Sequence, residues 1–385
     1  MKKIPYGKHH VTQQDINAVV NVLKSDNLTQ GPAIQIFEKN FSEYVGSKYA
    51  VAVSNGTAAL HLCALAMNIK SGDKVITTPI TFAATANCVK YCGGEIVFAD
   101  INKSTYLIDL EEVRKILTSD IKKEIKGIIP VNFAGRVINM EEFRDLANEF
   151  GCWIIEDACH SPGGSFINSK GERVNAGSGR YSELSIFSFH PVKHIAAGEG
   201  GMITTNSKEL YEKLLILRSH GIQQNPQKRI YDSSLWYYEM QELGFNYRLT
   251  DIQAALGNSQ LQRADKGLEK RRQIANFYKT SFESFSEIKD NNDLNSTEHA
   301  FHLYVIEVEK RKELYHHLRE KNIYVQVHYL PLHLMPFYRQ FGWIEGDFPK
   351  AENYYKKCIS LPIFPDLKSS ELNFVFETIS KFYHG

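Results

Sequence analysis

The stretch LSIFSFHPVKHIAAGEGGMITT, residues 184–205, contains two short apolar segments, LSIF and GMITT, separated by a run of small and polar residues. Short apolar segments bounded by such runs are typical of strands. The run between them contains one lysine, Lys193, close to a proline and two histidines. Most lysines are solvated at the surface, so a lysine between two strands is a candidate for a chemical role.

Five further apolar segments precede this stretch and alternate with helical patterns. They are YAVAV (49–53), KVITT (74–78), EIVFAD (95–100), KGIIPVNF (126–133) and CWIIEDA (152–158). Apolar strands that alternate with helices predict a mostly parallel sheet of seven strands, covered by helices on both faces. Because such sheets bind ligands beyond the carboxyl ends of their strands, the residues that follow each strand are the candidates for function.

The rest of the chain predicts helices at both ends and a second, smaller unit. Apolar residues at helical spacing indicate helices over residues 12–26 and 36–46, and a long helical stretch over 250–282. Strands over 301–309 and 323–329 and helices near 347–358 and 368–383 follow. We therefore expect an α/β protein whose large domain spans residues 1–250, with a linking helix and a small C-terminal α/β domain in residues 251–385.

Composition excludes several classes of protein. The 45 basic and 44 acidic side chains are mixed along the chain and give a net charge of +1, which does not suit binding to nucleic acid or to an anionic membrane. The sequence has no signal-like N-terminal segment and no run of about 18 apolar residues, so we expect a cytoplasmic protein. Its six cysteines form no C-x-x-C pair and are interpreted as buried free thiols, with no metal site.

The first strand end, SNGTAALHL after YAVAV, passes directly from strand to helix through Ser54, Asn55, Gly56 and Thr57. Free backbone N–H groups and the positive end of the helix would hold a phosphate there. An ordinary helix N-cap is the alternative. The segment lacks the glycine spacing of a dinucleotide fingerprint and the lysine of a P-loop.

The other two strand ends carry an acid and an amine. Asp157 follows CWII and could pair with the protonated nitrogen of a pyridine cofactor, or could cap a helix. Lys193, shortly after Ser188, would need burial or a cationic neighbour to act as a nucleophile, since the pKa of a free lysine is about 10.4. Taken together, a phosphate-binding turn, an acid and a lysine at strand ends predict pyridoxal phosphate, held by a Schiff base to Lys193.

The chain resembles the DegT/StrS family of sugar aminotransferases, which are fold-type-I pyridoxal phosphate enzymes. The resemblance covers nearly the whole chain in order: LTQGPAIQIFEKNF, SNGTAALHL, TTPITFAATAN, EDACHSPGG, SFHPVKHIAAGEGGMITTN, RSHGI and GFNYRLTDIQAALG. Within the family, LTQG, TTPITFAATAN, SFHPVK and VQVHY are most similar to the aminotransferases of pseudaminic acid biosynthesis. Some relatives have histidine in place of the lysine and catalyse dehydration, so the presence of Lys193 favours amino transfer.

The resemblance implies a role for each matching residue. Lys193 would be the catalytic lysine, which also moves the proton between substrate and cofactor. The cofactor-binding residues would be Gly56, Thr57, Phe82, Asp157, His160, Ser188 and Asn246. Asp157 would pair with the ring nitrogen, Phe82 would stack on the ring unless it is a core residue, and Asn246 would reach the phosphate of the other subunit. A homodimer with shared active sites would follow.

The resemblance also implies the substrates. Residues that match the nucleotide-sugar site are Tyr6, Leu28, Thr29, His328 and Tyr329, each of which could instead be a packing or surface residue. The expected reaction transfers an amino group from L-glutamate to the C4 keto group of a UDP-linked 4-keto-6-deoxy-N-acetylhexosamine. UDP-4-amino-4,6-dideoxy-N-acetyl-β-L-altrosamine would be the product. The alternatives are amination of another nucleotide-linked 4-ketosugar, either a UDP-4-keto pentose or a dTDP-4-keto-6-deoxyhexose, and a regulator that keeps the cofactor as a sensor.

Overall fold

The computed structural model describes residues 3–292 and 299–385 and contains a seven-stranded central sheet. The strand order is β2-β10-β9-β6-β5-β3-β4. The strands are β2 (Tyr49–Val53), β3 (Lys74–Thr77), β4 (Glu95–Phe98), β5 (Ile125–Ile129), β6 (Trp153–Asp157), β9 (Leu184–Ser188) and β10 (Gly201–Thr205). In this sheet β10 runs in the direction opposite to the other six strands. Each of the seven predicted segments forms a strand, which confirms the expected fold class.

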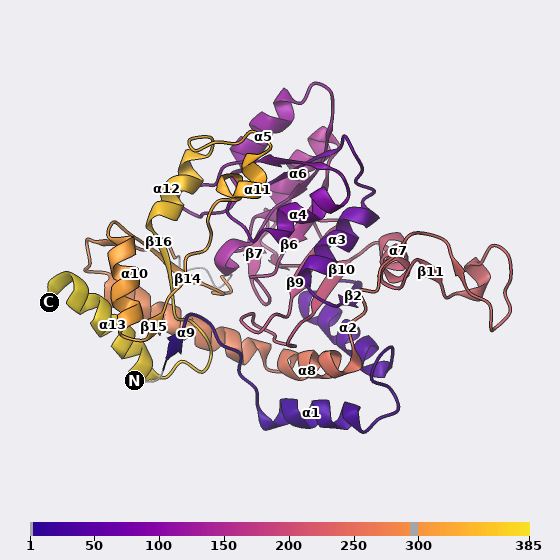
Figure 1. Ribbon diagram of the computed structural model, residues 1–385, viewed down its shortest axis with the longest axis horizontal. Helices are drawn as coiled ribbons and strands as arrows, with labels where there is room; N and C mark the ends of the chain where they lie inside the picture. Colours follow the sequence, from indigo (N-terminus) through magenta and orange to yellow (C-terminus); the bar gives the residue numbers. More distant parts are fainter. Residues whose placement is uncertain (1–2, 293–298) are drawn as a thin grey trace.

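Helices cover both faces of this sheet, as the uninterrupted apolar strands predicted (Figure 1). The neighbouring residues Ile154 and Ile155 of β6 are both fully buried, but they belong to cores on opposite faces. One face packs against α3 (Gly56–Ala66), α4 (Ala84–Tyr91) and α7 (Lys208–Arg218). The other packs against α2 (Pro32–Val45), α5 (Leu110–Ser119), α6 (Met140–Phe150) and α8 (Asp251–Leu261).

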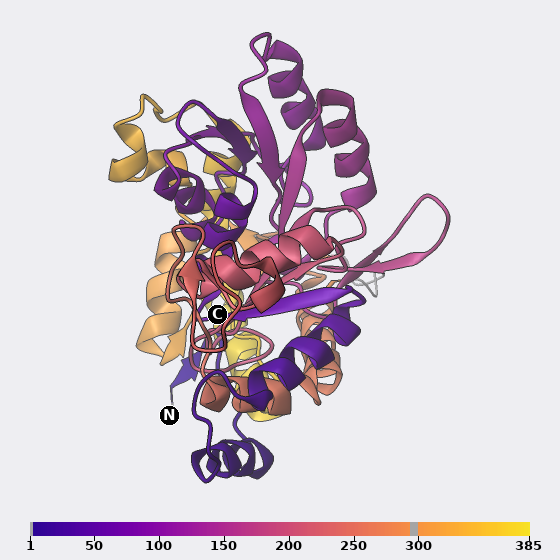
Figure 2. The ribbon, with the colours of Figure 1, turned by 90° about the vertical axis from the view of Figure 1, so that its right-hand side faces the viewer.

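The N-terminal helix α1 (Gln13–Leu23) lies against α8 rather than on the sheet, at the lower edge of the molecule in Figures 1 and 2. Thr12 caps α1 in a reciprocal pair with Asp15. The long helical stretch that we expected over 250–282 is divided into α8 and α9 (Ala264–Phe282), because Arg263 has non-helical dihedral angles.

The C-terminal part contains a smaller sheet of three antiparallel strands. These strands are β13 (Ile288–Lys289), β14 (Tyr304–Val308) and β16 (Cys358–Leu361), and they pack with α10 (Arg311–Glu320) and α13 (Ser369–His384). The strand β15 (Ile323–Tyr324) pairs in parallel with β1 (Ile4–Pro5), from the other end of the chain. The division at residue 250 stays a prediction, and the structure adds that β1 packs with the C-terminal part.

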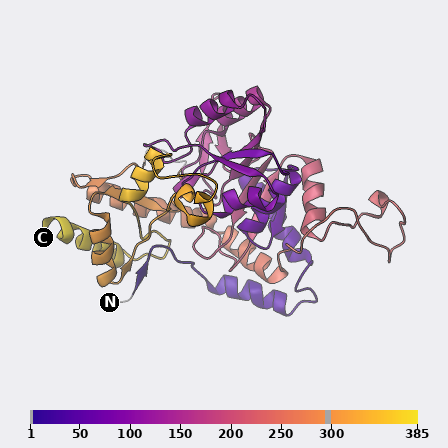
Figure 3. The same cartoon turned by 45° about the horizontal axis from the view of Figure 1, so that its top comes forward.

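Several short elements complete the chain. They are β7 (Ser165–Ile167), β8 (Arg173–Asn175), β11 (Ile222–Gln223), β12 (Glu239–Met240), α11 (Pro336–Arg339), α12 (Pro349–Lys357), η1 (Phe133–Gly135), η2 (Pro226–Lys228) and η3 (Leu332–Leu334). The hairpin of β11 and β12 projects from the body of the molecule (Figures 1 and 3). Within the two described ranges, no helix is long and apolar enough to cross a membrane.

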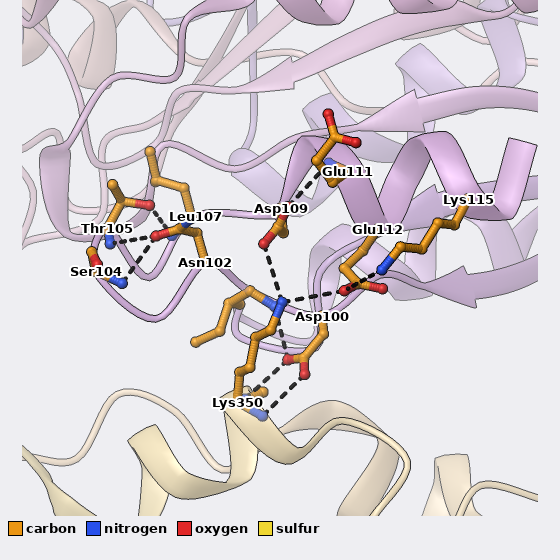
Figure 4. Close-up of polar contacts among 12 residues, drawn as sticks. Asp100, Asn102, Ser104, Thr105, Leu107, Asp109, Glu111, Glu112, Lys115 and Lys350 are labelled. Atoms are coloured by element: carbon orange, nitrogen blue, oxygen red, sulfur yellow. Dashed lines mark hydrogen bonds and ion pairs between the residues drawn. The ribbon is translucent and has the colours of Figure 1, made fainter.

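A polar cluster joins the C-terminal part to the large sheet (Figure 4). The buried carboxylate of Asp100, directly after β4, accepts hydrogen bonds from the backbone N–H groups of Lys350 and Ala351, each at 3.0 Å. These two residues lie in the first turn of α12, so Asp100 caps that helix from a distant part of the chain. The ammonium group of Lys350 contacts Asp109 and Glu112, each at 3.2 Å.

Candidate active site

A cleft of about 930 Å³ lies at the carboxyl ends of β2, β6 and β9 and is closed on one side by residues 326–329 of the C-terminal part. Ten of the residues singled out from the sequence line it. They are Tyr6, Gly56, Thr57, Phe82, Asp157, His160, Ser188, Lys193, His328 and Tyr329. The structure therefore brings the three strand ends together, as the parallel sheet predicted.

The turn from β2 into α3 provides the N-terminus of a helix at the floor of this cleft. Asn55 caps α3, and its side chain accepts from the N–H of Ala58 at 2.8 Å. The N–H groups of Gly56 and Thr57 have no partner inside the helix at such a position, and Gly56 lies beside Ser188. A Cβ atom on Gly56 would lie 3.0 Å from the Cβ of Ser188. The cap and the anion site are thus compatible, because Asn55 serves one and its neighbours the other.

Asp157, the last residue of β6, is buried at the cleft, with 5 % of its surface exposed. Its carboxylate accepts from the hydroxyl of Thr85 at 2.8 Å and from the N–H of Cys159 at 3.2 Å. Neither donor is charged, and within the described ranges no cationic side chain forms an ion pair with Asp157. A buried carboxylate with only neutral donors is suited to a positively charged ring nitrogen.

Lys193 lies in the loop between β9 and β10, where the backbone turns through a hydrogen bond from its N–H to the carbonyl of His190 at 2.8 Å. Burial lowers the pKa of its amine, and Arg271 adds to the shift, while Cys159 and Asp157 oppose it. Lysines lose their proton most easily in such surroundings. A larger fraction of the amine is therefore neutral, and able to react, than in a solvated lysine.

His160 is fixed in one tautomer by the backbone. The N–H of Ala134 points at its Nδ1 at 3.2 Å, and because an N–H can only donate, Nδ1 carries no proton. The ring hydrogen is then on Nε2, which lies 3.4 Å from the hydroxyl of Tyr329. Burial lowers the pKa of His160 well below its usual range, and the nearby Lys193 adds to this shift, so the ring is neutral.

Aromatic side chains line another part of the cleft. Phe82 is 62 % exposed and faces the cleft, with its ring centre 6.5 Å from that of Tyr329. This exposure rules out the core position that was its alternative. Tyr6 lies 5.1 Å from the ring of His328, and burial lowers the pKa of His328 to about 3. The imidazole of His328 is hydrogen-bonded to Ser360 at 2.9 Å.

Three of the expected residues do not line the cleft of their own chain: Leu28, Thr29 and Asn246. Thr29 bridges to Thr250, and the carbonyl of Leu28 accepts from Asp251, so both lie at the start of α8. Asn246, just before α8, is exposed. Leu28 and Thr29 therefore lie at the start of α8, and Asn246 pairs with Ser219 after α7, so all three lie outside the cleft of their own chain.

Other cleft residues were not found from the sequence. Thr85 holds Asp157 but lies inside α4, where the strand-end rule does not apply. His302 lines the cleft from a position just before β14, at the opposite end of its strand from where ligands were sought. Tyr247 lines it next to Asn246. No signal in the local pattern identifies these residues.

The donor set fits pyridoxal phosphate in three respects. The start of α3 and Ser188 offer hydrogen-bond donors to an anion. Asp157 lacks a cationic partner, and Lys193 has a lowered pKa and forms no ion pair within the described ranges. Asp157 could therefore pair with a positively charged ring, and Lys193 could react with an electrophile, in the same cleft.

Comparison with known proteins agrees with this chemistry. The chain matches the model of the DegT/DnrJ/EryC1/StrS aminotransferase family over residues 9–380. It is 38 % identical to the UDP-4-amino-4,6-dideoxy-N-acetyl-beta-L-altrosamine transaminase of Campylobacter jejuni, over 98 % of this chain and 96 % of that one.

Two solved structures are similar to the fold over nearly its whole length. Helicobacter pylori PseC, described as an aminotransferase involved in the biosynthesis of pseudoaminic acid, has a TM-score of 0.89 and 30 % identity, with 99 % of each chain covered. The putative sugar aminotransferase Spr1654 of Streptococcus pneumoniae, in its PLP form, has a TM-score of 0.88 and 27 % identity, with 99 % of this chain and 98 % of that one covered.

Proposed function

We propose a specific substrate for this chain, which belongs to the DegT/DnrJ/EryC1/StrS aminotransferase family and is a pyridoxal phosphate-dependent sugar aminotransferase. The family acts on a nucleotide-sugar ketone and takes the amino group from a donor. In our proposal, L-glutamate donates it to the C4 keto group of a UDP-linked 4-keto-6-deoxy-N-acetylhexosamine, which gives UDP-4-amino-4,6-dideoxy-N-acetyl-β-L-altrosamine. The similarity to the altrosamine transaminase over 98 % of the chain carries this assignment.

The residues of one subunit would hold the cofactor at three points. Backbone N–H groups of Gly56 and Thr57, with the hydroxyl of Ser188, would bind its phosphate. Asp157 would accept from the protonated ring nitrogen, kept in place by the hydroxyl of Thr85. The Nε2–H of His160 would face the ring oxygen.

Phe82 would cover one face of the ring, where its exposed aromatic surface faces the cleft. When bound, pyridoxal phosphate supplies an aldehyde that takes up the amino group and a ring that withdraws electrons from the reacting carbon. Nζ of Lys193 would remove a proton from that carbon and return it at the neighbouring one, acting as general base and then general acid. Its lowered pKa favours this exchange near neutral pH.

The sugar would lie on the other side of the cleft, against Tyr6, His328 and Tyr329. Burial raises the pKa of Tyr6 and Tyr329, so both hydroxyls stay protonated and can donate to sugar or phosphate oxygens. His328 is neutral and is oriented by Ser360. These side chains would orient the substrate and exclude water without adding a charge.

A homodimer with shared sites would complete the cleft. Lys193 is the single Lys or Arg side chain among the cleft-lining residues of the described chain, although both a nucleotide diphosphate and glutamate are anions. The exposed residues Leu28, Thr29 and Asn246 would face the partner's cleft. The projecting hairpin, which precedes Asn246 in the chain, exposes apolar side chains that a second copy would cover: Ile230, Tyr231, Leu235, Trp236, Tyr238, Met240 and Leu243.

The substrate assignment is tested by supplying the purified enzyme with glutamate and a panel of 4-ketosugars linked to UDP or dTDP, including a UDP-pentose. We expect the UDP-linked 4-keto-6-deoxy-N-acetylhexosamine to have the highest kcat/KM, and the product to have the altro configuration by NMR. Equal turnover of all ketosugars would contradict the assignment and favour another nucleotide-linked ketosugar.

The shared site is tested by mixing two inactive variants, Lys193→Ala and Asn246→Ala. A mixed dimer contains one cleft with both residues intact, so activity should reappear on mixing. Absence of any recovery, although both chains co-purify, would contradict the proposed dimer.

A further inference from the structure

Two histidines of the cleft stack on one another. The ring of His302 lies against that of His160, with 4.3 Å between ring centres and 39° between planes. Both are buried, with 4 % and 5 % of their surfaces exposed. His302 comes from the segment before β14, which belongs to the C-terminal part, whereas His160 follows β6 of the large sheet.

The backbone holds the two rings on a single turn, η1. The N–H of Ala134 donates to His160, and the carbonyl of Ala134 accepts from Leu303 at 3.1 Å. The carbonyl of Gly135 accepts from the N–H of Ala300 at 2.7 Å. A Cβ on Gly135 would lie 2.9 Å from the backbone N of His302, and its φ of 102° also favours glycine. The close approach of these segments fixes the distance between the rings.

His302 contributes no hydrogen bond from the sealed side of its ring. Its Nδ1 is buried and has no partner within the described ranges. Burial lowers the pKa of His302 well below its usual range, and Lys193, His160, His194 and Arg271 add to this shift. Because Nδ1 has no hydrogen-bond partner among the described residues, the contact that His302 makes with His160 is through its flat surface.

From these contacts we infer that His302 is a positioning residue for His160, and that its ring surface keeps the Nε2–H of His160 aimed into the cleft. The inference rests on the proposed function, in which that N–H faces the cofactor. Without the stack, the hydrogen bonds that orient the His160 side chain among the described residues are those to Ala134 and Tyr329. The ring would then rock within the cleft.

Two substitutions separate the ring surface from its nitrogens. His302→Phe keeps a flat ring at a position that lines the cleft, whereas His302→Leu is equally apolar but removes the ring. We expect His302→Leu to lower kcat about 10- to 100-fold, as misplacement of a catalytic group does, with little change in KM. His302→Phe should recover at least about a third of the wild-type kcat.

The matched control is His333→Leu. His333 is also a buried histidine whose Nδ1 has no partner among the described residues, but it lies outside the cleft and pairs with Glu352 at 3.0 Å. Its kcat for folded enzyme should stay within about twofold of wild type, as for a residue that does not touch the site. Since no hydrogen bond is lost at Nδ1 of His302, His302→Phe should not unfold at a lower temperature than the wild type.

The mobility of the His160 ring gives a readout that does not depend on the reaction. In the full-length protein labelled with ¹⁵N-histidine and freed of cofactor, NMR should show one sharp Nε2–H signal of His160 in the wild type and His302→Phe, but a signal broadened by exchange in His302→Leu, whose His160 ring has lost its flat support. Equal loss of kcat in both variants, an equally sharp His160 signal in His302→Leu, or unfolding of His302→Phe would overturn the inference. Failure to aminate the proposed sugar would leave the NMR result intact.

Discussion

Two aspartates that follow apolar strands have different surroundings in this molecule. Asp100 ends EIVFAD and Asp157 ends WIIED, and both are buried. Asp100 accepts three backbone N–H groups, two of them from α12. Asp157 accepts one hydroxyl and one N–H, and it faces a cleft. The difference shows that a buried acid whose partners are supplied by the chain is structural, whereas one with room for a cation is a candidate for binding.

The lysines near the two aspartates differ in the same way. Burial alone would lower the pKa of Lys350, but its hydrogen bonds to Asp109 and Glu112 outweigh burial and raise it. At Lys193 burial prevails and the pKa is lowered. The amine of Lys350 is held as a cation where α12 contacts the large sheet, whereas the amine of Lys193 is kept available for reaction.

The largest contrast should appear between the two lysines. Lys193→Ala should lower kcat by about 10⁴-fold, since general acid–base catalysis alone contributes up to that amount. Lys350→Ala should keep kcat within about twofold, because it removes partly exposed ion pairs. Steady-state rates with glutamate and the ketosugar check both, and a Lys193→Ala enzyme that turned over normally would remove the basis of the comparison.

The next contrast is between the two aspartates, of which only Asp157 should affect turnover. Asp157→Asn should lower kcat about 10²- to 10³-fold, the usual loss on removing one group that stabilises charge in a reaction, while its shape and the contact to Thr85 are kept. The variant should still fold and bind cofactor, which absorbance of the loaded enzyme reports. Unchanged kinetics would reject the pairing of Asp157 with the ring nitrogen.

Asp100→Ala should lower the stability of the protein but leave its turnover unchanged. Loss of the cap of α12 should reduce the free energy of unfolding by about 1–2 kcal/mol. Denaturant unfolding measures this change, and kcat for folded enzyme should not move. A loss of kcat without a loss of stability would show that the two aspartates are not separated as described.

The smallest contrast is in how the stability of the wild type and of His302→Phe changes as the pH falls. His302 is neutral in the folded chain because burial lowers its pKa, but it binds a proton below about pH 6.5 when unfolded. The unfolded chain then holds more protons, so the stability present above that pH is lost as the pH falls. Between about pH 7.5 and 5.5 the wild type should lose about 1.4 kcal/mol more than His302→Phe. Denaturant curves of the cofactor-free proteins at both pH values test this difference.

Sequence patterns predicted the parts of the molecule that depend on local order. The seven apolar segments form the sheet because each is short and mostly buried, with cores on both faces of the sheet, and the strand-end rule then located Asp157 and Lys193. The same rule also selects Asp100 and cannot show that this acid is structural. The reason is that two partners of Asp100 lie about 250 residues away, in α12. His302 was missed for a similar reason, since its contact to His160 joins two units.

The pairing of β1 with β15 means that the polypeptide passes twice between the large sheet and the C-terminal part. Residues between β1 and α1 form one crossing, and the passage from α8 into α9 forms the other (Figure 1). Because two separate segments connect the C-terminal part to the large sheet, it can rotate about the line that joins these two hinges. It cannot rotate freely about either hinge alone. Any opening of the molecule to admit a substrate should therefore follow a single rotation axis, with Tyr6 carried along beside one of the two crossings.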